Sequence, residues 1–299
     1  MEDSVTTLLT NWDIPPAVTC VLGMVAAIYA SGWAQIRRTR PQQFPLWRLV
    51  AFLGGIVAIF AAVASPLDTY SESLLFMHMA QHFVLMSVAP PLVVLGAPVV
   101  PMLRGIPRWF VRTVLGPLFS SRIGHHVARF LMRPPVAWIA MNAAYLGWHL
   151  PSAYEFALSS ENWHNFEHAC FFFSSVLFWW TILRPWPFRQ EGSGWTIVLY
   201  LSLADIVNTG LSAFLCFSGR LIYPSYGEIP RPFGLSALDD QIAAGALMWV
   251  LGSAVFLLPV VAIIMQFFSS PRAPRATSAG TRLDPRAAWQ LRRSEREVG

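Results

Sequence analysis

Apolar tracts about as long as a bilayer is thick recur from one end of this 299-residue chain to the other. A transmembrane helix needs roughly 20 consecutive, mostly apolar residues. Only 12% of the residues are charged, whereas soluble domains carry about twice that share. We therefore predict an all-α, polytopic membrane helix bundle with about seven transmembrane helices. The expected spans are residues 15–35, 47–65, 73–96, 135–150, 164–183, 195–217 and 241–268.

Several of the 23 prolines cluster at the ends of these tracts, where a residue without an amide donor does least harm. Pro90 and Pro91 are different, because they lie inside the third expected span. They should kink that helix, and a neighbouring helix can satisfy the carbonyls that they leave without a partner.

The basic residues set the orientation. All 21 are arginines, and they gather in alternate loops, at 37–48, 104–133 and 184–189, and again at 272–296. Only Arg220 and Arg231 fall on the opposite side. Because positively charged loops remain in the cytoplasm, we expect the N-terminus outside and the C-terminus in the cytoplasm. The formal charge of +5 then reflects topology and does not indicate a nucleic-acid partner.

The expected organisation is a periplasmic segment at 1–14, a transmembrane domain at 15–270 and a disordered cytoplasmic tail at 271–299. Within the domain, arginines alternate with apolar residues at 104–132, which predicts amphipathic helices on the cytoplasmic surface of the bilayer. His125 and His126 fall in that segment, and we expect both to be surface residues. The chain has no lysine, which excludes a retinal Schiff base.

Five of the seven histidines fall at the outer ends of the expected spans, namely His78, His82, His149, His164 and His168. Two of the spacings are HxxxH, which places both rings of a pair on one helix face. Neutral imidazole is a ligand of copper, zinc and iron, and a thioether in the same site favours Cu(I). We therefore predict a metal site on the outer face that uses these five histidines.

Other polar and thioether side chains lie within reach of this face. The carboxylates can orient the rings, and the methionines can add sulfur ligands. The candidates are Asp68, Glu72, Met77, Met86, Glu167, Asp239, Asp240 and Met248. Asp205 stands apart near the middle of the sixth span, where a carboxylate is paired, protonated or part of a relay.

The same residues allow other functions. His164 to His168 reads H-x-x-E-H, the inverted zinc-protease motif, in which Glu167 would activate water. Histidines on facing helices can also hold a haem iron, as in a b-type cytochrome. A third possibility is a metal-free assembly scaffold in which the histidines form hydrogen bonds between helices.

Several short blocks occur in a characteristic order along the chain. They are Ser65-Pro66-Leu67-Asp68, His78-Met79-Ala80-Gln81-His82, Ala89-Pro90-Pro91-Leu92, Gly96-Ala97-Pro98, Trp148-His149-Leu150-Pro151, His164 with Glu167-His168, Phe178-Trp179-Trp180, and Asp240-Gln241 with Ala244-Gly245 and Met248-Trp249. Together they resemble the multi-spanning CtaG-type assembly factors of cytochrome c oxidase, first associated with caa-type oxidases.

The resemblance implies a multi-pass protein of the bacterial inner membrane that assembles a haem–copper oxidase and is not an enzyme. It also implies a role in copper supply, with oxidase subunits and a periplasmic copper chaperone as partners. The functional residues would be the five histidines, with Asp68 and Asp240 beside them. We expect copper to be held only transiently and passed to the oxidase.

Overall fold

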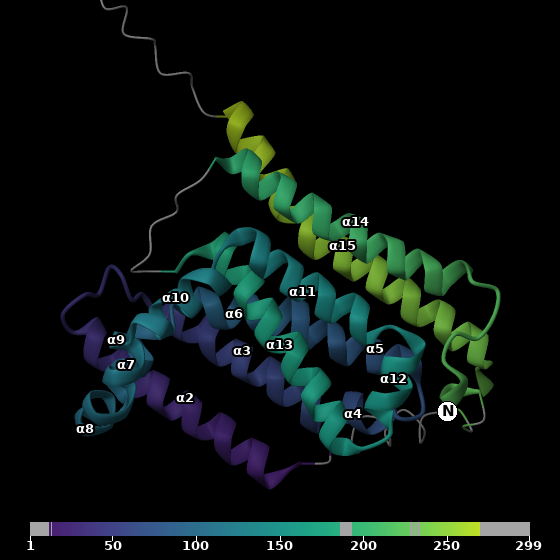
Figure 1. Cartoon of the computed structure of the whole chain (residues 1–299), viewed down its shortest axis with the longest axis horizontal. Helices are drawn as coiled ribbons and strands as arrows, with labels where there is room; N and C mark the ends of the chain where they lie inside the picture. Colours follow the sequence, from purple (N-terminus) through teal and green to yellow (C-terminus); the bar gives the residue numbers. More distant parts are fainter. Residues whose placement is uncertain are drawn as a thin grey trace, which may run out of the picture. The chain divides into compact units, whose positions relative to one another are not determined.

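The computed structural model describes Trp12 and residues 14–185, 193–227, 229, 231 and 234–269 (Figure 1). These residues form helices and contain no strand, which confirms the predicted all-α class. Most of the expected periplasmic segment at 1–14, and the expected tail at 271–299, lie outside the described residues. Contacts divide the chain into two units, Met1–Ala262 and Ile263–Gly299. The first unit holds every site discussed below.

Among the described residues, six helical segments are long and apolar enough to cross a membrane, and they confirm the polytopic prediction. They are α2 (Pro16–Arg37), α3 (Leu46–Ala64), the continuous run Leu75–Leu95, α13 (Glu161–Leu183), α14 (Gly194–Phe217) and α15 (Ala237–Ser269). The remaining expected span, 135–150, corresponds to α11 (Pro134–Trp148), which has 15 residues. At 1.5 Å per residue it is about 22 Å long, shorter than the bilayer core. The count of seven spans and the orientation therefore stay predictions.

The exposed faces of these helices are strongly apolar. Val57 of α3, Phe173 of α13, Ile206 of α14 and Val250 of α15 each expose more than 60% of their surface. Apolar area of this extent is unusual on a protein surrounded by water. It is the surface expected of helices that face lipid. The exposure of these apolar side chains therefore agrees with the membrane spans that hydropathy predicts.

The run Leu75–Leu95 contains Pro90 and Pro91 and is not a uniform helix. It consists of α5 (Leu75–Phe83), a π-helical turn η1 (Val84–Val88) and α6 (Ala89–Leu95). Pro90 cannot donate to the carbonyl of Met86, four residues earlier. The indole Nε1 of Trp179 on α13 donates to that carbonyl at 3.3 Å. The predicted compensation by a neighbouring helix is therefore present.

Shorter helices connect the long ones. They are α4 (Pro66–Ser71), α7 (Val99–Gly105), α8 (Arg108–Phe110), η2 (Val111–Leu115), α9 (Gly116–Ser120), α10 (Arg122–Leu131), α12 (Pro151–Leu158) and η3 (Pro224–Tyr226). The segment predicted as amphipathic, 104–132, is indeed helical over most of its length. His125 and His126 on α10 are exposed, as expected.

Two glycines allow α2 and α7 to pack backbone to backbone. A Cβ atom on Gly32 of α2 would overlap the carbonyl of Pro101, and one on Gly105 of α7 would overlap the carbonyl of Ile28. Small residues at such crossings are typical of membrane helices, because dispersion contacts rather than water exclusion hold the helices together.

Candidate metal centre

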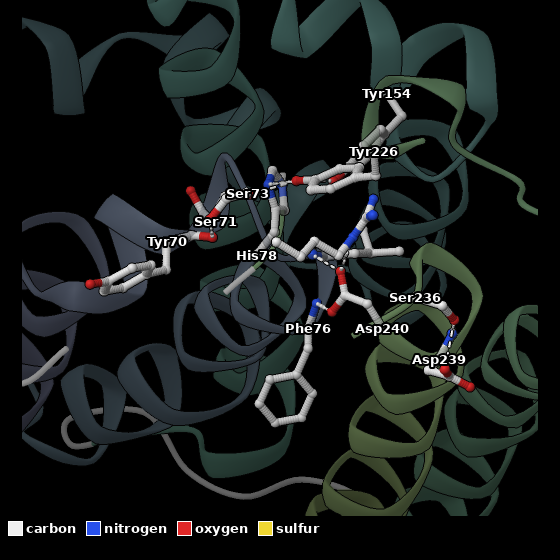
Figure 2. A network of polar contacts seen from close by, with 12 residues as sticks. Tyr70, Ser71, Ser73, Phe76, His78, Tyr154, Tyr226, Ser236, Asp239 and Asp240 are labelled. Carbon is white, nitrogen blue, oxygen red and sulfur yellow. Dashed lines mark hydrogen bonds and ion pairs between the residues drawn. The ribbon is translucent and has the colours of Figure 1, made fainter. Parts of the chain in front are cut away.

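Helix α5 carries His78 and His82, and a residue from the far end of the sequence fixes where it begins. The N-cap residue Leu74 provides no side-chain cap. Instead, Asp240 of α15 accepts hydrogen bonds from the backbone amides of Leu75 (2.7 Å) and Phe76 (3.0 Å) (Figure 2). A carboxylate at this place also interacts favourably with the helix dipole. Asp240 therefore anchors the helix, with both oxygens bonded to backbone amides rather than to a histidine ring.

Asp68 plays a comparable part on another side of α5. Its Oδ1 accepts from the side-chain amide of Gln81 at 2.6 Å, and the same amide donates to the carbonyl of Ala62 at 2.9 Å. Gln81 lies between the two histidines in sequence and is fully buried. Asp68 thus fixes the rotation of α5 through Gln81.

Helix α13 carries the second pair of histidines near its N-terminus. Ser160 caps this helix, since its hydroxyl accepts from the amide of Trp163. His164 and His168 follow one turn apart, and their ring centroids are 4.2 Å from each other. Helix α13 packs against α6 and α11 (Figure 1), and the rings on its first turns lie next to those of the α5 histidines.

The four rings form one cluster. His78 lies 4.2 Å from His82 and 5.0 Å from His164, and His82 lies 5.3 Å from His168, all between ring centroids. One nitrogen from each ring can be chosen so that all four nitrogens lie within 4.8 Å of one another. His78, His82 and His168 are buried, and His164 is partly buried.

Among the described residues, five ring nitrogens of this cluster are buried and have no hydrogen-bond partner. Nε2 of His78, His164 and His168, and both nitrogens of His82, are buried without a partner. A buried polar atom without a partner costs about 1–3 kcal/mol. Four such imidazoles with neighbouring nitrogens match the donor set of a transition-metal ion. Since the rings pack against one another, the space between them favours a single ion over a planar haem.

A tyrosine pair orients the His78 ring. Tyr226 Oη donates to the carbonyl of Ser71 at 2.6 Å and accepts from Tyr154 Oη at 3.1 Å. It also lies 3.3 Å from Nδ1 of His78 (Figure 2). Burial raises the pKa of Tyr226 far above its usual range, so the phenol stays neutral. With its proton directed at Ser71, Tyr226 accepts the Nδ1 proton of His78, and Nε2 of His78 is left free to bind an ion.

Glu167 adds a carboxylate to the buried cluster. Its side chain is fully buried, and neither oxygen has a hydrogen-bond partner. Oε1 lies 3.9 Å from Nε2 of His82. A carboxylate at this position can offset the charge of a bound cation. Of the predicted accessory carboxylates, Glu167 is the one placed against a ring of the cluster.

His149 lies beside the cluster, with its ring centroid 6.0 Å from that of His82. Its Nδ1 is 2.7 Å from the carbonyl of Tyr145, and its Nε2 is 3.3 Å from the sulfur of Met79. The hydroxyl of Tyr223 donates to the His149 carbonyl at 2.9 Å. The structure thus brings four of the five predicted histidines together, and it places the fifth in a separate environment.

The other predicted residues lie further away. Glu72 is exposed at the end of α4, and Asp239 is exposed and accepts from Ser236. Asp205 is partly buried, with Oδ1 lacking a partner. Met86 and Met248 line a small cavity next to His82 and His149. Tyr226 and Met79 were not predicted as site residues, because neither belongs to a spacing pattern typical of a metal site.

Comparison with known proteins relates this chain to a family. The family described as "Cytochrome c oxidase caa3 assembly factor" matches residues 27–270. Proteins of Mycobacterium bovis and Mycobacterium tuberculosis, both described as uncharacterized, are each 29% identical over 294 residues. A protein of Mycobacterium leprae is 23% identical over 270 residues. The alignments cover 86–88% of this chain but only 40–43% of those relatives. No solved structure matches the chain.

Proposed function

The chain belongs to the cytochrome c oxidase caa3 assembly factor family, and we propose that it delivers copper to a haem–copper oxidase during assembly. In this proposal the four-histidine cluster of His78, His82, His164 and His168 holds the ion transiently. The protein acts by binding and release, and catalyses no reaction.

One observation carries the proposal: four imidazoles from two helices converge with buried nitrogens that have no hydrogen-bond partner. Metal binding removes that cost, and neutral imidazole is a common ligand of copper. The Tyr226 contact supports it further, because an imidazole that donates its second N–H to a fixed acceptor is the usual arrangement in metal sites.

Access to the cluster favours transient binding. His164 and His168 also line an open groove, whose wall includes the carboxylate residues Asp68, Glu72 and Glu161. Negative groups beside an open groove attract cations by electrostatic steering. An ion in the cluster can therefore enter and leave on this side, unlike one in a closed structural site.

The proposed location is the bacterial inner membrane, with the cluster on the periplasmic side. The arginine distribution supports this orientation, and the family description supports an oxidase as the client. We propose oxidase subunits and a periplasmic copper chaperone as the partners. The matched relatives are more than twice as long as the aligned segment, and their additional parts do not enter the proposal.

A metal-free scaffold is the main alternative, in which the histidines only hold helices together. It predicts hydrogen bonds between the rings and their neighbours. Among the described residues, the cluster shows unpaired nitrogens instead. This difference is why we favour the copper proposal.

The test uses a bacterial strain without the protein, complemented with variants, and measures assembled oxidase by its haem spectrum and its copper content. His164→Ala should leave the oxidase deficient in copper, and added copper salts should partly restore it. His126→Ala, the same change on the exposed helix α10, should behave as wild type. Full oxidase assembly with His164→Ala at limiting copper would favour the scaffold instead.

A further inference from the structure

The cavity beside the four-histidine cluster is rich in sulfur. It is lined by His82 and His149 and by four methionines, Met79, Met86, Met141 and Met248. All four methionines are buried, and Met79 is completely so. No carboxylate or arginine is among the described residues that line it. A membrane-embedded cavity with this lining offers imidazole and thioether donors and no charged ones.

One contact in this cavity, between His149 and Met79, joins two atoms that both carry a lone pair. The carbonyl of Tyr145 can only accept a hydrogen bond, and it lies 2.7 Å from Nδ1 of His149. Nδ1 must therefore carry the proton, which leaves Nε2 of the neutral ring with a lone pair. That lone pair faces the sulfur of Met79 at 3.3 Å. Two electron-pair donors thus meet in a buried place with no proton between them.

The other protonation states do not resolve this contact. Moving the proton to Nε2 would set bare Nδ1 against the Tyr145 carbonyl at the shorter distance. A doubly protonated ring would place a cation in a cavity whose lining holds no carboxylate, which is costly in a membrane. A soft metal ion between the two atoms satisfies both lone pairs at once.

We infer that His149 Nε2 and Met79 Sδ form a second Cu(I) site, separate from the four-histidine cluster. Thioether and imidazole together select Cu(I) among biological metals. Metal–nitrogen and metal–sulfur bonds are roughly 2.0–2.3 Å in zinc sites, so donors 3.3 Å apart can both reach one ion of similar size. This inference rests on the proposed copper function and extends it.

The position of His82 connects the two sites. It belongs to the four-histidine cluster and also lines the methionine cavity. An ion that enters through the groove meets nitrogen ligands first and can then move to a mixed nitrogen and sulfur site that retains Cu(I) specifically. The pair would thus select the reduced ion after capture.

The test is an anaerobic titration of the detergent-purified, full chain with Cu(I), followed by X-ray absorption at the copper edge. Wild type should bind two equivalents and show a sulfur neighbour. Met79→Leu, which conserves volume, should bind one equivalent with no sulfur neighbour. Met77→Leu, on the same helix but outside the cavity lining, should match wild type. His164→Ala/His168→Ala should bind one equivalent and keep the sulfur signal.

The outcomes separate this inference from the proposed function. In one outcome, wild type binds a single copper equivalent with no sulfur neighbour, which Met79→Leu keeps and His164→Ala/His168→Ala loses. That result would overturn the second site and leave the function proposed for the four-histidine cluster intact. If wild type binds a single copper equivalent with a sulfur neighbour, and only Met79→Leu loses it, the second site is supported and the function proposed for the cluster is overturned. Absence of copper binding in wild type would overturn both.

Discussion

The hydroxyl of Tyr226 lies 3.3 Å from Nδ1 of His78 and donates its own proton to the carbonyl of Ser71. Tyr154 donates to the same hydroxyl. This arrangement leaves Tyr226 able to accept the ring proton of His78, which directs Nε2 of that ring into the cluster. A residue from a short 3-10 turn thereby sets the tautomer of a ring on α5.

Tyr226→Phe removes this acceptor and keeps the ring that packs around it. We expect Cu(I) affinity to fall about 10–100-fold, the usual cost of losing a group that orients a metal-binding histidine. Competition with a chromophoric Cu(I) chelator measures the affinity. Tyr70→Phe is the control, because Figure 2 shows the Tyr70 ring directed away from His78. Equal affinities in wild type and Tyr226→Phe would contradict the assignment.

Glu167→Gln tests whether the buried carboxylate offsets the charge of a bound ion. A unit charge about 6 Å from the ion contributes about 3 kcal/mol at an effective dielectric of 20, so we expect Cu(I) affinity to fall roughly ten- to hundredfold. The same competition assay applies, with Asp239→Asn on the exposed first turn of α15 as the control. If Glu167 instead activates water in a hydrolase, the variant would keep its metal affinity and lose a peptidase activity that wild type shows.

Asp240→Ala removes the cap of α5. Loss of a side-chain cap costs about 1–2 kcal/mol, and Arg231, whose Nε lies 3.8 Å from Oδ2 of Asp240, loses its carboxylate as well. We expect the thermal midpoint of the detergent-solubilised protein to fall by several degrees. Asp240→Asn keeps one oxygen acceptor and should fall less, and Asp239→Asn at the neighbouring exposed site should change little. An unchanged midpoint for Asp240→Ala would show that α5 does not depend on this cap.

Gly32→Ala tests the close crossing of α2 and α7. The added methyl group would overlap the Pro101 carbonyl, and overpacking costs about 1–3 kcal/mol or more. We expect a lower thermal midpoint, with copper binding per folded molecule unchanged because the crossing is formed by other helices than those of the cluster. Gly23→Ala is the matched control on the same helix, since nothing lies within 4 Å of its Cβ position. Equal midpoints for the two variants would contradict the packing account.

The sequence allowed prediction of features that depend on local pattern. Apolar tracts predicted the long helices, and HxxxH spacing predicted which rings share a face, because both follow from the 3.6-residue helical repeat. The proline pair predicted an irregular third span. In the structure the irregularity is the π-helical turn η1. The Trp179 indole donates a hydrogen bond to the carbonyl of Met86, as the expected compensation requires.

Features that depend on helix register could not be predicted in this way. Asp240 contacts Leu75 across 165 positions of sequence, and Tyr226 contacts His78 across 148. Neither pairing follows from local periodicity, because each depends on how far one helix slides and rotates against another. For the same reason the sequence grouped His149 with the other four histidines, although its ring nitrogens face Tyr145 and Met79.

The most direct measurement of the central claim is the copper content of protein purified anaerobically from copper-replete cells, determined by mass spectrometry of the element. Wild type should carry copper, and His78→Ala/His82→Ala should lose at least half of it. His125→Ala/His126→Ala, a double change on exposed α10, should keep the wild-type content. Equal copper in all three proteins, or a copper-free wild type that still supports oxidase assembly, would contradict the account.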